Sequence, residues 1–247
     1  MNPPIWDQRI KKLAETVSGT RLITKDIIFD KVAVIVEPRI LPITESLLTW
    51  MVYLLAPKGW KFMFYTGTTN HKIIHELVEK LGISDVVEIR NLYKENLTIQ
   101  DYNWLLTSIH FWANMPYENV LIFQTDTVLL DGDLDKFLEY DYVGAPWDRN
   151  FSWLHNPETD VVGNGGLSLR KRSGMLRAIN NVPYNDINED RYFCINCKDV
   201  LNIAPVELAI QFSVESVFYS NLKGYHKCWD YIGDKMIEVY KHLDKLI

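Results

Sequence analysis

The chain has few of the features that mark secreted or membrane proteins. Only three of its 247 residues are cysteine, an odd number that argues against a disulfide framework. Its first residues lack a basic segment followed by an apolar one, so no signal peptide is evident. No apolar run reaches the roughly 18–20 residues that a membrane helix needs. These absences predict a cytoplasmic protein without a membrane span.

Basic residues are also scarce relative to acidic ones. The chain has 26 Lys and Arg against 32 Asp and Glu, which gives a formal net charge of −6. Because the binding of nucleic acid phosphates requires clustered positive charge, we expect no nucleic acid partner. Hydrophobic residues make up 47% and charged residues 23%, which excludes a disordered or low-complexity chain.

Short apolar runs alternate with helical patterns through the first half of the chain. The run 32–36 is apolar throughout and rich in Val and Ile, which is typical of a strand buried on both faces. The alternation predicts a parallel sheet with helices on both faces. The predicted strands are 32–36, 60–65, 86–90 and 119–123, and the predicted helices are 44–55, 70–81 and 98–115.

The second half is less regular and shows no repeat and no linker between two folding units. We therefore expect one mixed α/β domain over residues 31–232, preceded by a helical lead-in (1–30) and followed by a C-terminal helix (233–247). A loop is predicted over 147–163. The predicted strands are 142–145, 166–169 and 206–212, and the predicted helices are 173–180, 190–200 and 235–246.

Polar residues follow the predicted strands at their carboxyl ends, where open α/β sheets bind ligands. The strand 119–123 leads directly into Gln124-Thr125-Asp126. A carboxylate buried alone at this point is costly, so Asp126 needs a metal, a cation or hydrogen-bond donors. The alternative is an aspartate that caps the next turn. The ends of the first two strands add further candidates: Glu37, Arg39, Thr66 and Gly67.

Three of the four residues from 163 to 166 are glycine, directly before a predicted strand. Glycines there let the backbone approach a bulky group, and a tight turn with a bulge is the alternative interpretation. The spacing is not that of a dinucleotide-binding loop, because no helix is predicted to start there.

Two later pairs of polar residues are candidates for chemistry. Glu189 and Asp190 follow Asn188, a good helix N-cap, although acidic residues at a helix start are also favoured by the helix dipole alone. His226 and Lys227 lie on an aromatic-rich segment after a glycine. This histidine is a candidate metal ligand with a phosphate-binding neighbour, and a structural histidine is the alternative.

Two further patterns are interpreted as packing. Cys194 and Cys197 form a C-x-x-C within a helical pattern and without a second pair, so we expect two core thiols rather than a zinc site. Trp104 and Trp112 on the predicted helix 98–115 are expected to lie in the core.

Taken together, these segments resemble glycosyltransferases of the GT-A type. Gln124-Thr125-Asp126-Thr127 is similar to their Asp-x-Asp element, although glutamine replaces the first aspartate and would ligate Mn²⁺ only weakly. The glycine-rich segment 162–170 is similar to their acceptor-side strand, and 188–193 to the Glu-Asp helix start of inverting members. The segment 224–229 resembles the late His and Lys of glycogenin-like enzymes, which bind metal and diphosphate.

A closer likeness, over about residues 30–230, is to a little-characterised family of glycosyltransferase-like proteins defined as a domain of unknown function. This resemblance implies a GT-A-like (Rossmann-type) fold, with a nucleotide-binding half at 31–130 and an acceptor-binding half at 131–232. The segments that carry it are 36–39, 123–126, 142–147, 164–166 and 212–215.

The resemblance also implies the chemistry. The donor would be a nucleotide sugar, first of all a UDP-sugar, and the acceptor a hydroxyl of a glycan, a protein or a small molecule. Asp126 and His226 would hold Mn²⁺ or Mg²⁺. Asp190 would be the base, oriented by Glu189, and direct attack would invert the anomeric centre. The nucleotide and its diphosphate would contact Glu37, Arg39, Thr66, Gly67, Gln124, Thr125, Asp126 and Lys227, and the sugar and acceptor Trp147, Asn164, Gly165 and Gly166.

Two other functions compete with this one. A nucleotide- or carbohydrate-binding module without activity, on the same fold, is favoured by Gln124 at the first position of the Asp-x-Asp element. A nucleotidyltransferase that makes sugar nucleotides would need a Gly-rich, basic loop after the first strand, which Glu37-Pro38-Arg39 does not supply.

Overall fold

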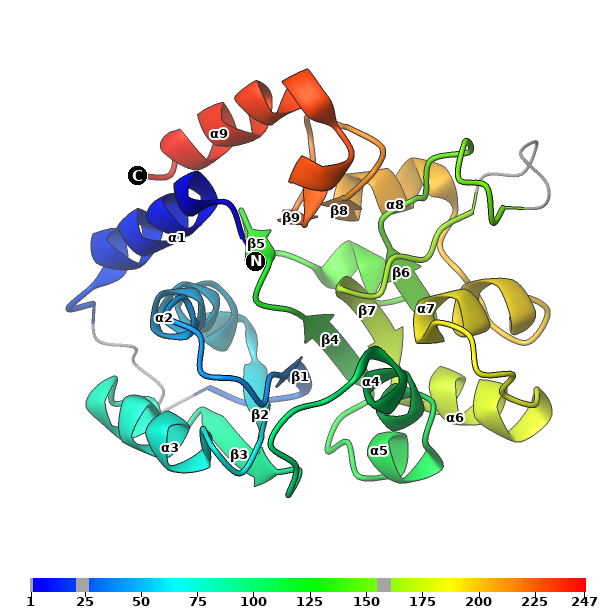
Figure 1. Cartoon of the computed structure of the whole chain (residues 1–247), viewed down its shortest axis with the longest axis horizontal. Helices are drawn as coiled ribbons and strands as arrows, with labels where there is room; N and C mark the ends of the chain where they lie inside the picture. The colour runs from blue at the N-terminus through cyan, green and yellow to red at the C-terminus, as the bar shows by residue number, and fades with distance from the viewer. Residues whose placement is uncertain (1, 21–26, 155–160) are drawn as a thin grey trace.

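A central sheet organises the structure, a computed structural model that describes residues 2–20, 27–154 and 161–247 (Figure 1). The strands of this sheet are β1 (Lys31–Val36), β2 (Trp60–Thr66), β3 (Val87–Asn91), β4 (Asn119–Phe123), β6 (Tyr142–Gly144) and β7 (Leu167–Lys171). Their order is β3-β2-β1-β4-β7-β6, and the pairs from β3 to β4 are parallel. β7 is antiparallel to both of its neighbours. A mostly parallel sheet in an α/β domain is therefore confirmed.

Helices cover both faces of this sheet, as the apolar pattern of β1 predicts (Figure 1). Ala33 and Ile35 pack into one hydrophobic cluster, whereas Val32, Val34 and Val36 pack into the other, since successive side chains of a strand point to opposite faces. The first cluster includes residues of α1 (Pro4–Val17), α2 (Thr44–Leu55), α3 (His71–Lys80) and α9 (Met236–Asp244). The second includes residues of α4 (Ile99–Leu106), α5 (Ile109–Ala113) and α6 (Arg172–Asn181).

A small second sheet lies beyond the carboxyl end of β4. It consists of β5 (Thr127–Leu129), β9 (Gly224–His226) and β8 (Ser213–Val214), in that order. β5 and β9 are antiparallel, with Thr127 opposite His226. This pairing brings the segment after β4 beside a segment about one hundred residues later in the chain.

One predicted strand is wrong. Residues 206–212 form a helix, α8 (Val206–Phe212). The alternation of Val206, Leu208 and Ile210 with polar residues and Ala209 has the period of a strand. However, Pro205 occupies the N-cap, and Ala209 and Phe212, three residues apart, are buried on one side. A short apolar run does not distinguish the two periods by itself.

Two predicted helices are shorter than expected. The helix predicted over 98–115 is broken between α4 and α5, because the Ser108 hydroxyl accepts a hydrogen bond from Phe111 N and starts a new helix. Trp112 is buried, but Trp104 is 53% exposed, so its predicted core position is wrong. The helix predicted over 190–200 consists of α7 (Glu189–Arg191) followed by a π-helix at Tyr192–Asn196.

The remaining predictions concern segments outside the sheet. Cys194 and Cys197 are both buried and unbridged, as expected for core thiols. Part of the predicted loop 147–163, residues 155–160, lies outside the described residues, as do residues 1 and 21–26 of the lead-in. In the part of the chain that the structure describes, no helix has the length and apolarity needed to cross a membrane. Single turns of 3-10 helix occur at Ala56–Lys58, Asp135–Phe137, Cys228–Asp230 and Gly233–Lys235.

Candidate active site

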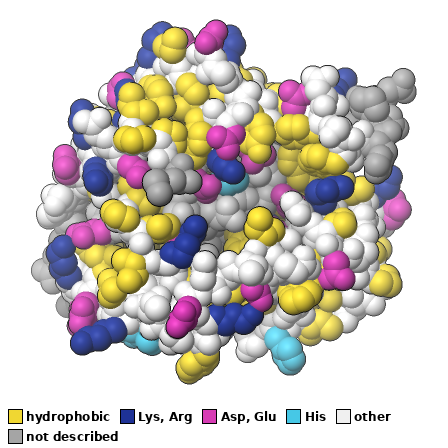
Figure 2. All heavy atoms as spheres, viewed as in Figure 1, with side chains coloured by type: hydrophobic (Ala, Val, Ile, Leu, Met, Phe, Trp, Pro, Cys, Tyr) yellow, Lys and Arg dark blue, Asp and Glu magenta, His cyan; other side chains and the backbone are white. Residues whose placement is uncertain are grey.

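A cavity of about 460 Å³ lies at the carboxyl ends of β1 and β4. Figure 2 shows this region as a hollow near the middle of the viewed face, with acidic, basic and histidine side chains around it. Its volume is in the range of small-molecule sites. The predicted site residues that line it are Glu37, Arg39, Gln124, Thr125, Asp126, Asn164, Gly165, Gly166, Glu189, Asp190, His226 and Lys227.

Asp126 and His226 face one another in this cavity. Asp126 Oδ1 and His226 Nε2 are 3.2 Å apart, and Lys227 N donates a hydrogen bond to the Asp126 carbonyl oxygen over 3.1 Å. Both side-chain atoms are buried, yet neither has a partner in hydrogen-bonding geometry among the described residues. The pairing of β5 with β9 produces this juxtaposition. Because Thr127 lies opposite His226, the preceding residue Asp126 lies beside His226.

Glu215 lies on the other side of the imidazole. Its Oε1 is 3.2 Å from His226 Nδ1 and also accepts a hydrogen bond from Asn164 Nδ2 over 2.7 Å. Burial disfavours the imidazolium, but the charges of Asp126 and Glu215 outweigh it and raise the pKa of His226 to about 10. Burial opposes the ionisation of Asp126, and His226 outweighs it, which lowers the pKa of that carboxyl.

These residues fit a divalent cation as two of its ligands. Asp126 Oδ1 and His226 Nε2 are buried and close together, and carboxylate and neutral imidazole are both ligand types for Mn²⁺, so the cation would displace the imidazolium proton. Glu215 on Nδ1 would orient the ring, as carboxylates do behind metal-bound histidines. Within the described residues no three His, Cys, Asp or Glu side chains form a group able to hold a metal, so substrate and water would complete the coordination.

The glycines at 165 and 166 allow close approach of side chains to the backbone. A Cβ added to Gly166 would collide with the His226 ring, and one added to Gly165 would collide with the Glu189 carboxylate. The glycines thus let the backbone lie close to bulky groups, and these groups are side chains of the protein itself. Asn164 Oδ1 accepts a hydrogen bond from Gly166 N over 3.2 Å and fixes the turn.

The end of β1 holds an ion pair at the cavity. Arg39 donates to both carboxylate oxygens of Glu37, each over 2.7 Å, and Arg39 N donates to Oε1 over 3.0 Å. Glu37 is buried, while the Arg39 side chain is 56% exposed. Because the Glu37 carboxylate is occupied, Arg39 is the group of this pair that remains accessible to a ligand.

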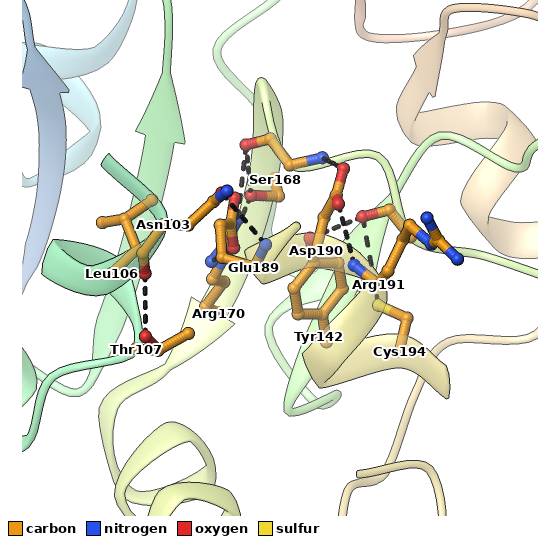
Figure 3. Close-up of polar contacts among 12 residues, drawn as sticks. Asn103, Leu106, Thr107, Tyr142, Ser168, Arg170, Glu189, Asp190, Arg191 and Cys194 are labelled. Atoms are coloured by element: carbon orange, nitrogen blue, oxygen red, sulfur yellow. Dashed lines mark hydrogen bonds and ion pairs between the residues drawn. The ribbon is translucent and has the colours of Figure 1, made fainter. Parts of the chain in front are cut away.

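Glu189 and Asp190 are adjacent in sequence but have different environments (Figure 3). Glu189 is buried and accepts hydrogen bonds from Arg170 over 2.6 and 3.0 Å. Its backbone N donates to Asn103 Oδ1 over 3.1 Å, whereas Asn188 occupies the N-cap without a side-chain cap bond. No hydrogen bond between Glu189 and Asp190 is found in the described part of the chain.

Asp190 is half-buried and lines the cavity. Its carboxylate accepts hydrogen bonds from Arg191 N over 2.8 Å and from Gly165 N over 3.3 Å. Burial and then the Glu189 charge raise the pKa of Asp190 to about 7. Near neutral pH this carboxyl therefore exchanges a proton easily, which is the property of a general base or acid.

Three predicted site residues do not line the cavity. Thr66 is fully buried, and its hydroxyl lies 2.8 Å from His71 Nδ1. Gly67 N donates to Asn70 Oδ1 over 2.8 Å, and a Cβ there would collide with Pro38. Trp147 is 5% exposed and its ring packs against Gly163. These residues support the loops around the site, and none of the three lines the cavity.

Sequence reasoning missed several lining residues. Glu215 lies in the segment 212–215 that carries the family resemblance and directly follows β8, but no role was predicted for it. Tyr102 lines the cavity, and its buried hydroxyl has no partner in hydrogen-bonding geometry among the described residues. Burial raises the pKa of Tyr102, and the nearby Gln124 offsets only part of this increase. The periodicity of a predicted helix does not distinguish such a tyrosine from a residue that packs in the core. Arg170, which does not line the cavity but binds Glu189 behind it, was also missed, because a single arginine in a strand forms no motif.

A family model described as "Protein of unknown function (DUF5672)" matches residues 86–229 of the chain. The chain belongs to this family. The matched segment contains Asp126, Gly165, Asp190 and His226, and thus most of the cavity. No curated protein sequence matches the chain.

Many solved structures are similar to this DUF5672 protein, including two glycosyltransferases. One is the mannosyltransferase PcManGT from Pyrobaculum calidifontis in complex with GDP-Man and Mn²⁺, with 14% identity, a TM-score of 0.49 and coverage of 80% of this chain. The other is the apo form of the glycosyltransferase GlyE in Streptococcus pneumoniae TIGR4, with 11% identity, a TM-score of 0.47 and coverage of 87%. The chain spans 61% of the first protein and 51% of the second.

Proposed function

We propose that this protein is a metal-assisted glycosyltransferase of the GT-A type, which transfers a sugar from a nucleoside diphosphate donor to an acceptor hydroxyl. One observation carries the proposal. A single cavity at the carboxyl end of the sheet contains the buried Asp126–His226 pair, whose facing atoms lie outside hydrogen-bonding geometry, and a carboxyl, Asp190, with a pKa of about 7. The first suits a metal-bound diphosphate, and the second suits a base near neutral pH.

The chain's own residues would act as follows. Asp190, held by the Gly165 and Arg191 backbone N–H groups, accepts the proton of the acceptor hydroxyl as that oxygen attacks the anomeric carbon. The bond to the diphosphate breaks on the other side of that carbon, so the configuration inverts. Among the described residues, Lys227 and the exposed Arg39 are the Lys and Arg side chains that line the cavity, and they would bind the negatively charged diphosphate. A divalent ion at Asp126 and His226, when bound, would neutralise charge on the leaving group.

The donor is identified by an assay with a panel of nucleotide sugars, UDP-sugars first, in the presence of Mn²⁺ or Mg²⁺. Release of nucleoside diphosphate is measured with and without candidate acceptors, which include glycans, proteins and small molecules. We expect release with one donor class, dependence on the metal, and loss of activity in D190N. Absence of release with every donor contradicts the proposal.

A binding module without activity is the second candidate, because Gln124 lines the cavity where an Asp-x-Asp element would provide a carboxylate. Calorimetry with UDP and Mn²⁺ distinguishes the two. Binding without turnover of any donor favours the module, whereas turnover excludes it.

A further inference from the structure

Arg170 on β7 carries a fully buried charge that the proposed reaction does not use. Its guanidinium donates to both oxygens of Glu189, and its Nε donates to Ser168 Oγ over 2.9 Å. It lies over the Tyr142 ring, 4.8 Å from the centroid. Such a two-point, stacked arrangement fixes the orientation of the guanidinium plane, which a lysine could not reproduce.

The same guanidinium is connected to Asp190 through the backbone of one residue, Gly165. Arg170 Nη2 donates to the Gly165 carbonyl oxygen over 3.4 Å, and Gly165 N donates to Asp190 Oδ2 over 3.3 Å. Gly165 has no room for a side chain, because a Cβ would collide with the Glu189 carboxylate and approach Arg170 Nη2 to 3.0 Å. Figure 3 shows Glu189 beside Arg170, with Asp190 turned toward a different partner. The two adjacent carboxylates thus have different partners: Glu189 binds Arg170, and Asp190 binds backbone N–H groups.

We propose that Arg170 is a positioning residue for Asp190, which holds Glu189 away from the acceptor and fixes the backbone of Gly165 that orients the base. The inference rests on the proposed function in that Asp190 is taken as the base. It assigns Glu189 a new role, since the Glu189 carboxylate compensates the charge of Arg170 instead of orienting Asp190 directly.

The inference has an electrostatic consequence. Loss of Arg170 leaves the Glu189 charge uncompensated beside Asp190, which favours the protonated form of Asp190. Loss of both Arg170 and Glu189 removes one charge of each sign, so the Asp190 carboxyl should titrate near its original pH. The other titratable or charged groups near Asp190 stay in place in every variant: Tyr142, Arg191, Cys194, Glu215 and Tyr231.

The test compares R170M, R170K and the double variant R170M/E189Q with the wild-type protein. The titration of the Asp190 carboxyl carbon is followed by NMR in the unliganded protein, with D190N to assign the signal. We expect its midpoint to rise by about one pH unit in R170M, which lowers the ionised fraction and kcat about tenfold below that midpoint. In R170M/E189Q the midpoint should return, while kcat stays low because Gly165 has lost its partner. R170K should keep the midpoint near wild type but not restore kcat.

Arg177 provides the matched control. It pairs with the nearly buried Asp141 carboxylate on the same face of the sheet and lies outside the cavity lining. R177M should lose stability but keep the Asp190 midpoint and kcat. If R170M fails to fold, R170M/E189Q carries the test, because replacing both partners of a buried pair is often tolerated. An unchanged midpoint in R170M, or wild-type kcat in the double variant, overturns the inference. Failure of the wild-type protein to use any nucleotide sugar overturns the proposed function, whereas the titration still decides whether Arg170 controls Asp190.

Discussion

On the β5–β9 side of the cavity (Asp126, Glu215, His226 and Lys227), Asp126 and His226 lie 3.2 Å apart without a hydrogen-bond partner among the described residues. On the β7–α7 side (Gly165, Arg170, Glu189 and Asp190), Glu189 is bound at both oxygens by Arg170. One side thus contains buried ion pairs whose facing atoms lie outside hydrogen-bonding geometry. The other contains a completed ion pair behind a single available carboxyl.

This difference separates binding from chemistry. Buried polar atoms without partners are costly, so a site that has them gains stability when a ligand supplies the missing contacts. A completed ion pair gains nothing from a ligand and instead fixes its neighbours. We therefore expect substitutions on the β5–β9 side to affect donor and metal binding, and those on the β7–α7 side to affect turnover.

The largest effect should come from Asp126. Replacement by alanine removes one of the two protein ligands that we propose for the metal, and leaves His226 with Glu215 alone. In D126A, calorimetry with UDP and Mn²⁺ should show no metal-dependent binding. D244A, which alters an exposed ion pair with Arg9, is the control and should bind as the wild type does. Undiminished binding in D126A contradicts the metal site.

The next largest effect should come from Asp190. D190N keeps the shape of the side chain but cannot accept a proton, so kcat should fall roughly 10²–10⁴-fold. Donor affinity should stay within a few-fold of the wild type. D186N, an exposed aspartate just before α7, should leave both unchanged. An equal loss of binding and turnover, or no loss, refutes the role of Asp190 as base.

Glu215 should have a smaller effect, confined to binding. In E215Q the ring of His226 loses the carboxylate on Nδ1, and metal affinity should fall roughly 10–100-fold. The affinity is measured by titration with Mn²⁺ in the presence of UDP. The exposed Glu207 provides a control, since E207Q should not alter the affinity. A change in kcat at saturating metal would contradict the assignment of Glu215 to binding alone.

The raised pKa of Asp190 predicts a dependence of stability on pH. A carboxyl whose pKa is higher in the folded than in the unfolded state stabilises the fold below the unfolded pKa, and this contribution is lost as pH rises through the folded value, here about 7. The wild type should therefore lose stability relative to D190N between about pH 4 and pH 7, by up to about 1.4 kcal/mol per pH unit. Urea unfolding at several pH values measures this. A constant difference across this range contradicts a raised pKa.

The smallest effect on ligand binding should come from Trp147. Its ring packs against Gly163 and edge to face with Trp153, outside the cavity lining. W147F should lower the unfolding free energy by about 1–3 kcal/mol and keep donor affinity within twofold. Thermal unfolding and calorimetry measure the two. A large loss of donor affinity in a folded W147F would indicate that Trp147 contacts the donor.

Apolar patterning was sufficient to predict the alternating first half of the fold, because a fully apolar strand such as 32–36 must be covered on both faces. It was insufficient for 206–212, where seven residues fit either period and the contacts of Ala209 and Phe212 decide the helix. The site was predictable where a strand ended in polar residues, as at Asp126. Arg170 could not be predicted, since its partner Glu189 is nineteen residues away on a different element.

The order of apolar and polar residues along the chain was enough to determine the layered α/β class and the sheet edge at which the cavity lies, because both follow from local periodicity. The neighbours of each charged side chain were decided by the tertiary structure. Antiparallel pairing of β5 with β9 places His226 against Asp126, and the position of α7 behind β7 gives Glu189, but not Asp190, a permanent cation. Electrostatic interactions depend on distance in space rather than in sequence, and so these two carboxylates, adjacent in the chain, differ in chemistry.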